Sequence, residues 1–208
     1  MLKTKVFASN ISNLTDARYF AAWEVEWLGF QLATEHPDYL SPQTIKVIKE
    51  WVEGPKIAGI FNTETLDNIQ QVAEFLELDA LVVPMEAPVN ELAEQLQRPI
   101  IVEVPIRSSQ DLVDLDFRLA DLGENVSYFL INFEENPLNW IGESFKPICD
   151  RYPILIALPP LQATQLATLL DELHPAGLQL KGSTEEKVGF KSFDELDELF
   201  ELLEQTTT

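Results

Sequence analysis

The sequence has few of the residues that build metal centres, disulfides or nucleotide-binding turns. Its 208 residues include one cysteine, Cys149, and two histidines, His36 and His174. A single thiol excludes an internal disulfide, and no His, Cys, Asp and Glu set has the spacing of metal ligands, so we expect no metal and no cofactor. The sequence also lacks a Gly-x-Gly-x-x-Gly turn, which argues against an open dinucleotide-binding sheet.

Long apolar runs are absent as well. No stretch approaches the length that crosses a bilayer, and the segment Met1–Lys5 lacks the apolar core of a secretion signal. We therefore expect a cytoplasmic protein that does not enter the membrane.

Basic residues are scarce. The chain has 14 Lys and Arg against 35 Asp and Glu, a net charge of −21. Such a surface repels phosphate backbones and anionic lipids, so we expect no binding to nucleic acid or to membrane surfaces. Many of the acids lie on amphipathic segments such as 193–204, where they alternate with apolar residues at helical spacing.

A regular alternation of short apolar runs and amphipathic segments makes up the rest of the chain. Runs such as Ile100-Ile101-Val102 are continuously apolar, which is typical of parallel strands covered on both faces. The predicted strands are Thr4–Ser9, Trp27–Leu32, Lys56–Phe61, Ala80–Pro84, Ile100–Val104, Tyr128–Asn132, Ile154–Leu158 and Gly177–Lys181.

Helical segments follow each of these strands. Ser41 before Pro42 is a favourable helix start, because proline fits the first helical position. The predicted helices are Leu14–Trp23, Pro42–Val52, Thr65–Glu77, Val89–Gln97, Ser109–Leu122, Pro137–Asp150, Gln162–His174 and Phe193–Glu204. Eight such units with short connections predict one domain over residues 1–208, a TIM (β/α)8 barrel of the α/β class with a closed parallel sheet and outer helices. An open doubly wound sheet is the alternative.

Several motifs, in order and at the right spacing, resemble phosphoribosylanthranilate isomerases. These motifs are Asn13-Leu14-Thr15-Asp16-Ala17, Leu28-Gly29-Phe30, His36–Pro42, Lys56–Asn62, Leu78-Asp79-Ala80, Glu185 and Gly189-Phe190-Lys191. The likeness spans nearly the whole chain and is strongest in the first 80 residues. It implies a (β/α)8 barrel of the tryptophan biosynthesis family.

The resemblance also implies a set of functional groups. Family members open the ribose ring of phosphoribosylanthranilate and move a proton, with a cysteine base ending the first strand and an aspartic acid ending the sixth. A substrate-binding arginine follows the second strand, and glycine-rich loops near strands six to eight hold phosphate.

This sequence differs at each of those positions. Ser9 replaces the cysteine, and a serine hydroxyl needs an adjacent base to act. Asn132 replaces the acid, and an amide has no proton to give as a general acid. Asp38 replaces the arginine, which reverses the charge that would meet an anionic substrate.

The phosphate loops are also replaced. Residues 134–137 read Glu-Glu-Asn-Pro, and residues 157–160 read Ala-Leu-Pro-Pro, in place of glycine-rich turns. Proline has no N–H for a phosphate, and side chains block its approach. Lys181, Gly182 and Ser183 are the candidates that could still hold an anion or substrate.

Three functions follow as hypotheses. The one we favour is a barrel of isomerase descent without isomerase activity, which acts in binding or assembly. The second is a small-molecule site with different chemistry at the C-terminal mouth of the barrel, and the third is a genuine isomerase that uses Ser9 and Asn132 with a water relay. Bulky side chains filling the mouth near Phe7, Pro84 and Leu158 would exclude a ligand.

For the second hypothesis, we expect the polar side chains at strand ends to surround the ligand. These are Ser9, Gln31, Asn62, Glu86, Glu103, Asn132, Gln179 and Lys181, with His36 facing the same end. Glu103 and Lys181 could serve as acid and base, or form a structural ion pair. We expect a monomer or a homodimer, for which Trp23, Trp27 and Trp51 could form a shared patch.

Overall fold

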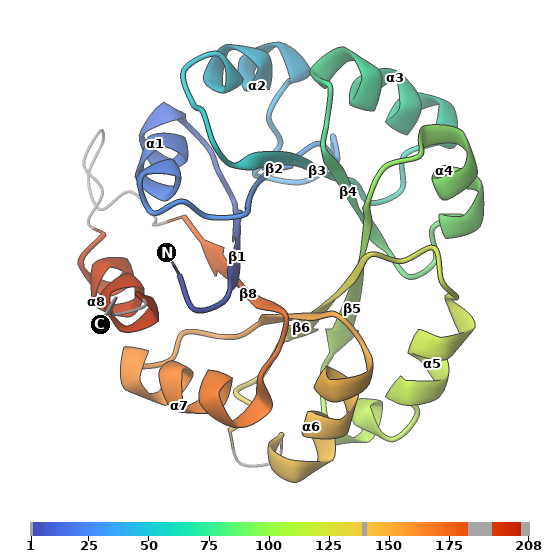
Figure 1. Ribbon diagram of the computed structural model, residues 1–208. Helices are drawn as coiled ribbons and strands as arrows, with labels where there is room; N and C mark the ends of the chain where they lie inside the picture. The colour runs from blue at the N-terminus through green and yellow to red at the C-terminus, as the bar shows by residue number, and fades with distance from the viewer. Residues whose placement is uncertain (1, 139–140, 183–192, 205–208) are drawn as a thin grey trace.

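The computed structural model is a closed barrel of eight parallel strands surrounded by helices (Figure 1). It describes residues 2–138, 141–182 and 193–204. The strands, which pair in chain order with β8 closing on β1, are β1 (Lys5–Ser9), β2 (Trp27–Gln31), β3 (Lys56–Ile60), β4 (Ala80–Pro84), β5 (Ile100–Ile106), β6 (Tyr128–Phe133), β7 (Ile154–Ala157) and β8 (Gly177–Lys181). The predicted TIM barrel is confirmed.

The helices lie between consecutive strands, except the last, which follows β8, and each lies beside the sheet it covers. They are α1 (Leu14–Ala22), α2 (Pro42–Lys49), α3 (Leu66–Leu76), α4 (Val89–Leu96), the 3-10 turn η1 (Ser109–Leu112), α5 (Leu115–Asp121), α6 (Gly142–Arg151), α7 (Ala163–Leu173) and α8 (Asp194–Leu203). None of these described helices is both long and apolar enough to span a membrane.

Two predicted helices differ from the structure. The segment 109–122 is a 3-10 turn followed by a separate helix, because the Asp111 carboxylate accepts the backbone N–H groups of Arg107 and Ser108 and holds a tight turn there. The helix predicted from Pro137 begins at Gly142 instead. Pro137 and Asn136 belong to the connection after β6, where the Asn136 side chain accepts the N–H of Leu138.

Local capping bonds fix where α1 and α2 begin. The Asn13 side chain accepts the N–H of Asp16, and the buried Asp16 carboxylate accepts the N–H and hydroxyl of Ser12. The Ser41 hydroxyl accepts the N–H of Thr44, as expected for a serine that precedes a helix. These bonds satisfy backbone N–H groups that have no partner within the helix.

Two apolar clusters result from the alternation of side chains along each strand. One face of the strands packs with the helices in a large outer shell. The opposite face fills the barrel with a smaller cluster that includes Phe7, Trp27, Val82, Ile101 and Leu130. At the amino ends of the strands, the Lys5 ammonium lies over the rings of Trp27 and Tyr128 and bonds the Tyr128 hydroxyl. This end of the barrel is therefore closed.

The last helix is held against the first by aromatic contacts. The Tyr19 hydroxyl of α1 donates to the Asp197 carboxylate of α8 at 2.6 Å, and Trp23 stacks on Phe200 with ring centroids 4.8 Å apart.

The three tryptophans considered as a shared patch, Trp23, Trp27 and Trp51, do not form one. Trp27 lies inside the barrel, and Trp51 is 62% exposed on the outside.

The single thiol gives a pH-dependent prediction. Burial, together with the neighbouring Asp150 carboxylate, raises the pKa of Cys149 to about 12. An unfolded thiol has a pKa of about 8.5. Between about pH 8.5 and the folded pKa, the thiol is protonated in the folded chain and ionised in the unfolded chain, so the free energy of unfolding falls as pH rises. Between about pH 8 and 10, we expect the free energy of unfolding, measured with urea, to fall by about 1–2 kcal/mol more in the wild type than in Cys149→Ala. Equal decreases in the two proteins would contradict this prediction.

Candidate functional site

The carboxyl ends of the strands surround a polar cavity of about 280 Å³. Side chains two residues apart on a strand share a face, so Gln179 and Lys181 of β8 both point inward. Of the side chains predicted from strand ends, those lining the cavity are Ser9, Gln31, Asn62, Glu103, Asn132, Gln179 and Lys181, together with His36. The barrel closure brings seven of the eight predicted strand-end residues to one place.

Two predicted residues lie elsewhere. Glu86, beyond the end of β4, does not line the cavity. Asp38, at the position of the family's arginine, is also outside the lining and is largely exposed on the connection after β2. Its backbone N–H donates to Nδ1 of His36 at 3.1 Å, which leaves Nε2 to carry the proton of a neutral imidazole.

The Glu103 carboxylate inside the mouth is hydrogen-bonded to Asn132, which stands at the family's acid position. Asn132 of β6 donates from Nδ2 to Oε1 of Glu103 on β5, with an N–O distance of 2.8 Å. Both side chains are half-buried. The bond fixes the Asn132 amide so that its carbonyl oxygen remains an acceptor, and it holds the Glu103 carboxyl in the cavity.

Ser9 stands at the family's base position and is buried, with 1% of its surface exposed. Within the described part of the chain, its hydroxyl has no hydrogen-bond partner, and none of the cavity's other side chains forms the activated pair that a nucleophilic or basic hydroxyl requires. Its neighbour in register is Lys181 of β8. The mouth therefore has a hydroxyl without a described partner at the strand position paired with Lys181.

The backbone near the last strand is already bonded. The N–H of Gly182 donates to the Ser9 carbonyl at 3.0 Å and so continues the sheet past Lys181. A Cβ at this glycine would lie 3.1 Å from the Asn10 carbonyl oxygen, so the residue is close to β1. Ser183, the other residue considered for anion binding, lies outside the described residues.

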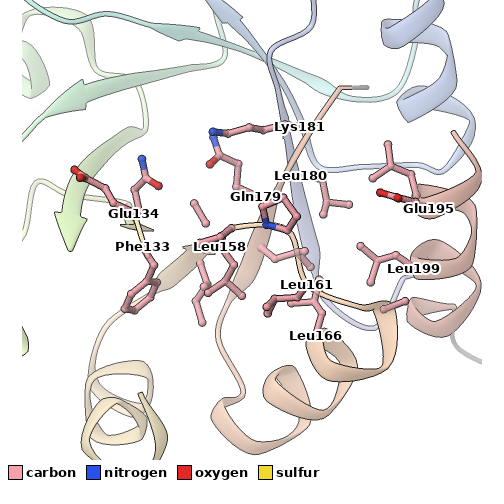
Figure 2. A pocket seen from close by; sticks show the side chains of 18 residues that line it. Phe133, Glu134, Leu158, Leu161, Leu166, Gln179, Leu180, Lys181, Glu195 and Leu199 are labelled. Atoms are coloured by element: carbon pink, nitrogen blue, oxygen red, sulfur yellow. The ribbon is translucent and has the colours of Figure 1, made fainter. Parts of the chain in front are cut away.

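A second cavity of about 570 Å³ lies beside the mouth, between the ends of β6–β8 and helices α7 and α8 (Figure 2). Leucines and prolines make up much of its wall: Leu158, Pro159, Pro160, Leu161, Leu166, Leu196 and Leu199. Asn132, Gln179 and Lys181 line both cavities. This cavity was not predicted from the sequence, although the Leu-Pro-Pro-Leu run after β7, which forms part of its wall, was a signal for it.

The connection after β6 is acidic. Glu134 pairs with Arg107 at 3.1 Å, and its backbone N–H donates to the carbonyl of Ile106. Glu135 follows as an exposed acid. Together with the prolines of residues 159 and 160, these side chains occupy the places where the sequence resemblance implies phosphate-binding glycines.

No metal centre is apparent among the residues the structure describes. They contain no group of three or more His, Cys, Asp and Glu side chains placed to hold an ion. The charged groups in the cavity wall are Glu103 and Lys181, with the imidazole of His36.

This arrangement defines a class: a (β/α)8 barrel with a polar site at the carboxyl ends of its strands, where barrels of this kind bind their ligands. No protein-family profile matches the chain. It is 23% identical over 208 residues to N-(5'-phosphoribosyl)anthranilate isomerase from Thermotoga maritima, with 94% of this chain and 95% of that protein covered.

Solved structures of that family have the same fold. The isomerase from Thermus thermophilus is 22% identical with a TM-score of 0.75, and that from Pyrococcus furiosus is 13% identical with a TM-score of 0.76; each match covers 96% of this chain and 98% of the other. A structure of monomers generated from the dimeric Thermotoga maritima isomerase matches with a TM-score of 0.76 at 19% identity. The chain therefore has the phosphoribosylanthranilate isomerase fold, and its resemblance to that family is confirmed.

Proposed function

We propose that this chain is a divergent barrel of the phosphoribosylanthranilate isomerase type that does not catalyse the isomerisation and instead binds a small polar molecule in its mouth. The observation that carries the proposal is the pair of residues at the ends of β1 and β6. Ser9 is a buried hydroxyl without a described partner, and Asn132 is an amide bonded to Glu103. Neither group exchanges a proton readily near neutral pH.

The loss of phosphate-binding groups supports the same conclusion. The Gly182 N–H is used by the Ser9 carbonyl, and prolines 159 and 160 offer no N–H at all. Asp38 adds negative charge after β2. An anionic sugar phosphate would face the Glu103 carboxylate in the cavity and the acidic connection after β6, with few backbone N–H donors, which lowers its affinity.

One observation favours a second candidate, a divergent isomerase. The Glu103 carboxyl lies within hydrogen-bond distance of Asn132, so it could supply the proton that the family's aspartic acid supplies. That mechanism lacks a base, because no described base is hydrogen-bonded to Ser9.

Complementation separates the two candidates. Expressed in a tryptophan auxotroph that lacks this isomerase, the chain is expected not to restore growth without tryptophan, because both proton-transfer groups are missing. A functional family member expressed in the same strain is the positive control, and immunoblotting confirms that this chain accumulates. Growth that depends on Glu103, lost in Glu103→Gln, would establish the divergent isomerase instead.

A further inference from the structure

The mouth cavity carries two opposite charges on separate walls. Glu103 extends from β5 and Lys181 from β8, and two other strands lie between them in the sheet. Among the described residues, neither side chain forms an ion pair with the other or with any third group. The structural ion pair considered from the sequence is thus not formed, and both charges remain available to a ligand.

The wall formed by β5 and β6 presents hydrogen-bond acceptors. Asn132 donates its amide hydrogen to Oε1 of Glu103, so the amide orientation is fixed and its carbonyl oxygen is left as an acceptor. The second Glu103 oxygen, Oε2, makes no bond to a described residue. An ammonium group has three donors and no acceptor, which matches this wall.

The wall formed by β8 and β1 presents donors. Lys181 and Ser9 are partners in register, so their side chains lie next to each other on the inner face of the sheet. Figure 2 shows Lys181 and Gln179 extending from β8 away from Leu199 of α8 and toward β6. The Ser9 hydroxyl, buried without a described partner, is stabilised by any ligand that accepts its hydrogen.

We propose that the cavity binds a small zwitterion, an amino carboxylic acid whose ammonium group contacts Glu103 and Asn132 and whose carboxylate contacts Lys181 and Ser9. The inference rests on the proposed function, because it takes the mouth as a binding site. A volume of about 280 Å³ suits a ligand of amino-acid size. A sugar phosphate is a poorer match, because its net negative charge would face Glu103 and the acidic connection after β6.

Isothermal titration with a panel of free amino acids, including β-alanine and γ-aminobutyrate, tests the proposal directly. At least one member is expected to bind the wild type. Glu103→Gln and Lys181→Met are each expected to weaken that binding by about 10- to 100-fold, the effect of removing one charged hydrogen-bond partner. Glu94→Gln, an exposed acid on α4, is the matched control and is expected to bind as the wild type does.

Derivatives of the bound amino acid show whether its ammonium group contacts the wall with Glu103 and its carboxylate contacts the wall with Lys181. The methyl ester keeps only the ammonium, so its affinity is expected to fall in Glu103→Gln and to be unchanged in Lys181→Met. The N-acetyl derivative keeps only the carboxylate, and the opposite pattern is expected. Circular dichroism of each variant shows that it is folded, and Glu103→Asp tests whether a shorter carboxylate rescues binding.

Two results would overturn the inference. One is no binding by any member of the panel at concentrations up to about 10 mM, beyond the range of weak affinity. The other is binding of ribose 5-phosphate or inorganic phosphate alone, which leaves the mouth a binding site but makes its ligand an anion. Turnover of phosphoribosylanthranilate, measured separately, is what would overturn the proposed function.

Discussion

Phosphoribosylanthranilate mixed with the purified protein is expected to remain unconverted, apart from its spontaneous decay. A positioned general acid or base contributes about 10²–10⁴-fold to a rate, so the absence of both lowers turnover by about 10⁴-fold or more. Among the described residues, the structure places a hydroxyl without a hydrogen-bond partner at Ser9 and a bonded amide at Asn132. Chromatography of substrate and product over time measures the rate.

The double variant Ser9→Cys/Asn132→Asp tests whether the two missing groups account for the whole loss. We expect it to gain activity but to stay well below an ordinary kcat/KM, because the substrate remains poorly bound and weak binding lowers kcat/KM independently of the proton-transfer groups. Asp38 and the Gly182 N–H bonded to Ser9 remain unchanged in this variant. A wild-type kcat/KM within the ordinary enzyme range of about 10⁴–10⁸ M⁻¹s⁻¹ would contradict the proposed function.

The substitution Gly177→Ala is expected to destabilise the barrel by about 2–3 kcal/mol, the upper part of the range for overpacked interiors. A Cβ at Gly177 would lie 2.5 Å from the backbone oxygen of Lys5 and 2.9 Å from Cδ2 of Leu155. Gly177 and Lys5 are partners in the pairing of β8 with β1. Because the closer atom belongs to the backbone, relief requires these two strands to separate where the barrel closes.

Gly142→Ala is the matched control, since a Cβ there has no neighbour within 4 Å among the described atoms. It lies at the first position of α6, and its effect is expected to stay within about 0.5 kcal/mol. Urea unfolding of both variants beside the wild type gives the comparison. Equal urea midpoints for Gly177→Ala and the wild type would contradict this prediction, because they would show that β1 and β8 accommodate the added methyl group without cost.

Much of the architecture could be predicted because its signals are local. A continuously apolar run such as 100–102 identifies a strand covered on both faces, and Ser41 before Pro42 identifies a helix start. The predictions were wrong where an interaction outside the pattern decided the backbone. The Asp111 carboxylate, which captures two N–H groups, divides the segment 109–122. The helix predicted from 137 begins five residues later.

The candidate site was predictable as a set of strand ends but not as a geometry. Residues at the carboxyl ends of parallel strands meet at one mouth in any barrel, so seven of the eight strand-end candidates line the cavity. Three features depend instead on strand register and on the paths of the loops. Glu103 bonds Asn132, Glu103 and Lys181 form no ion pair, and Asp38 lies outside the cavity lining. None of these has a local signal.

The sequence by itself determined the eight strand–helix units, the acidic surface and the chemical identity of the groups at the strand ends. Only the tertiary structure decided which of those groups share a cavity and which are already bonded. The physical reason is that hydrophobic period and capping act between near neighbours in the chain. Strand pairings such as that of Ser9 with Lys181 exist only after β8 has closed on β1.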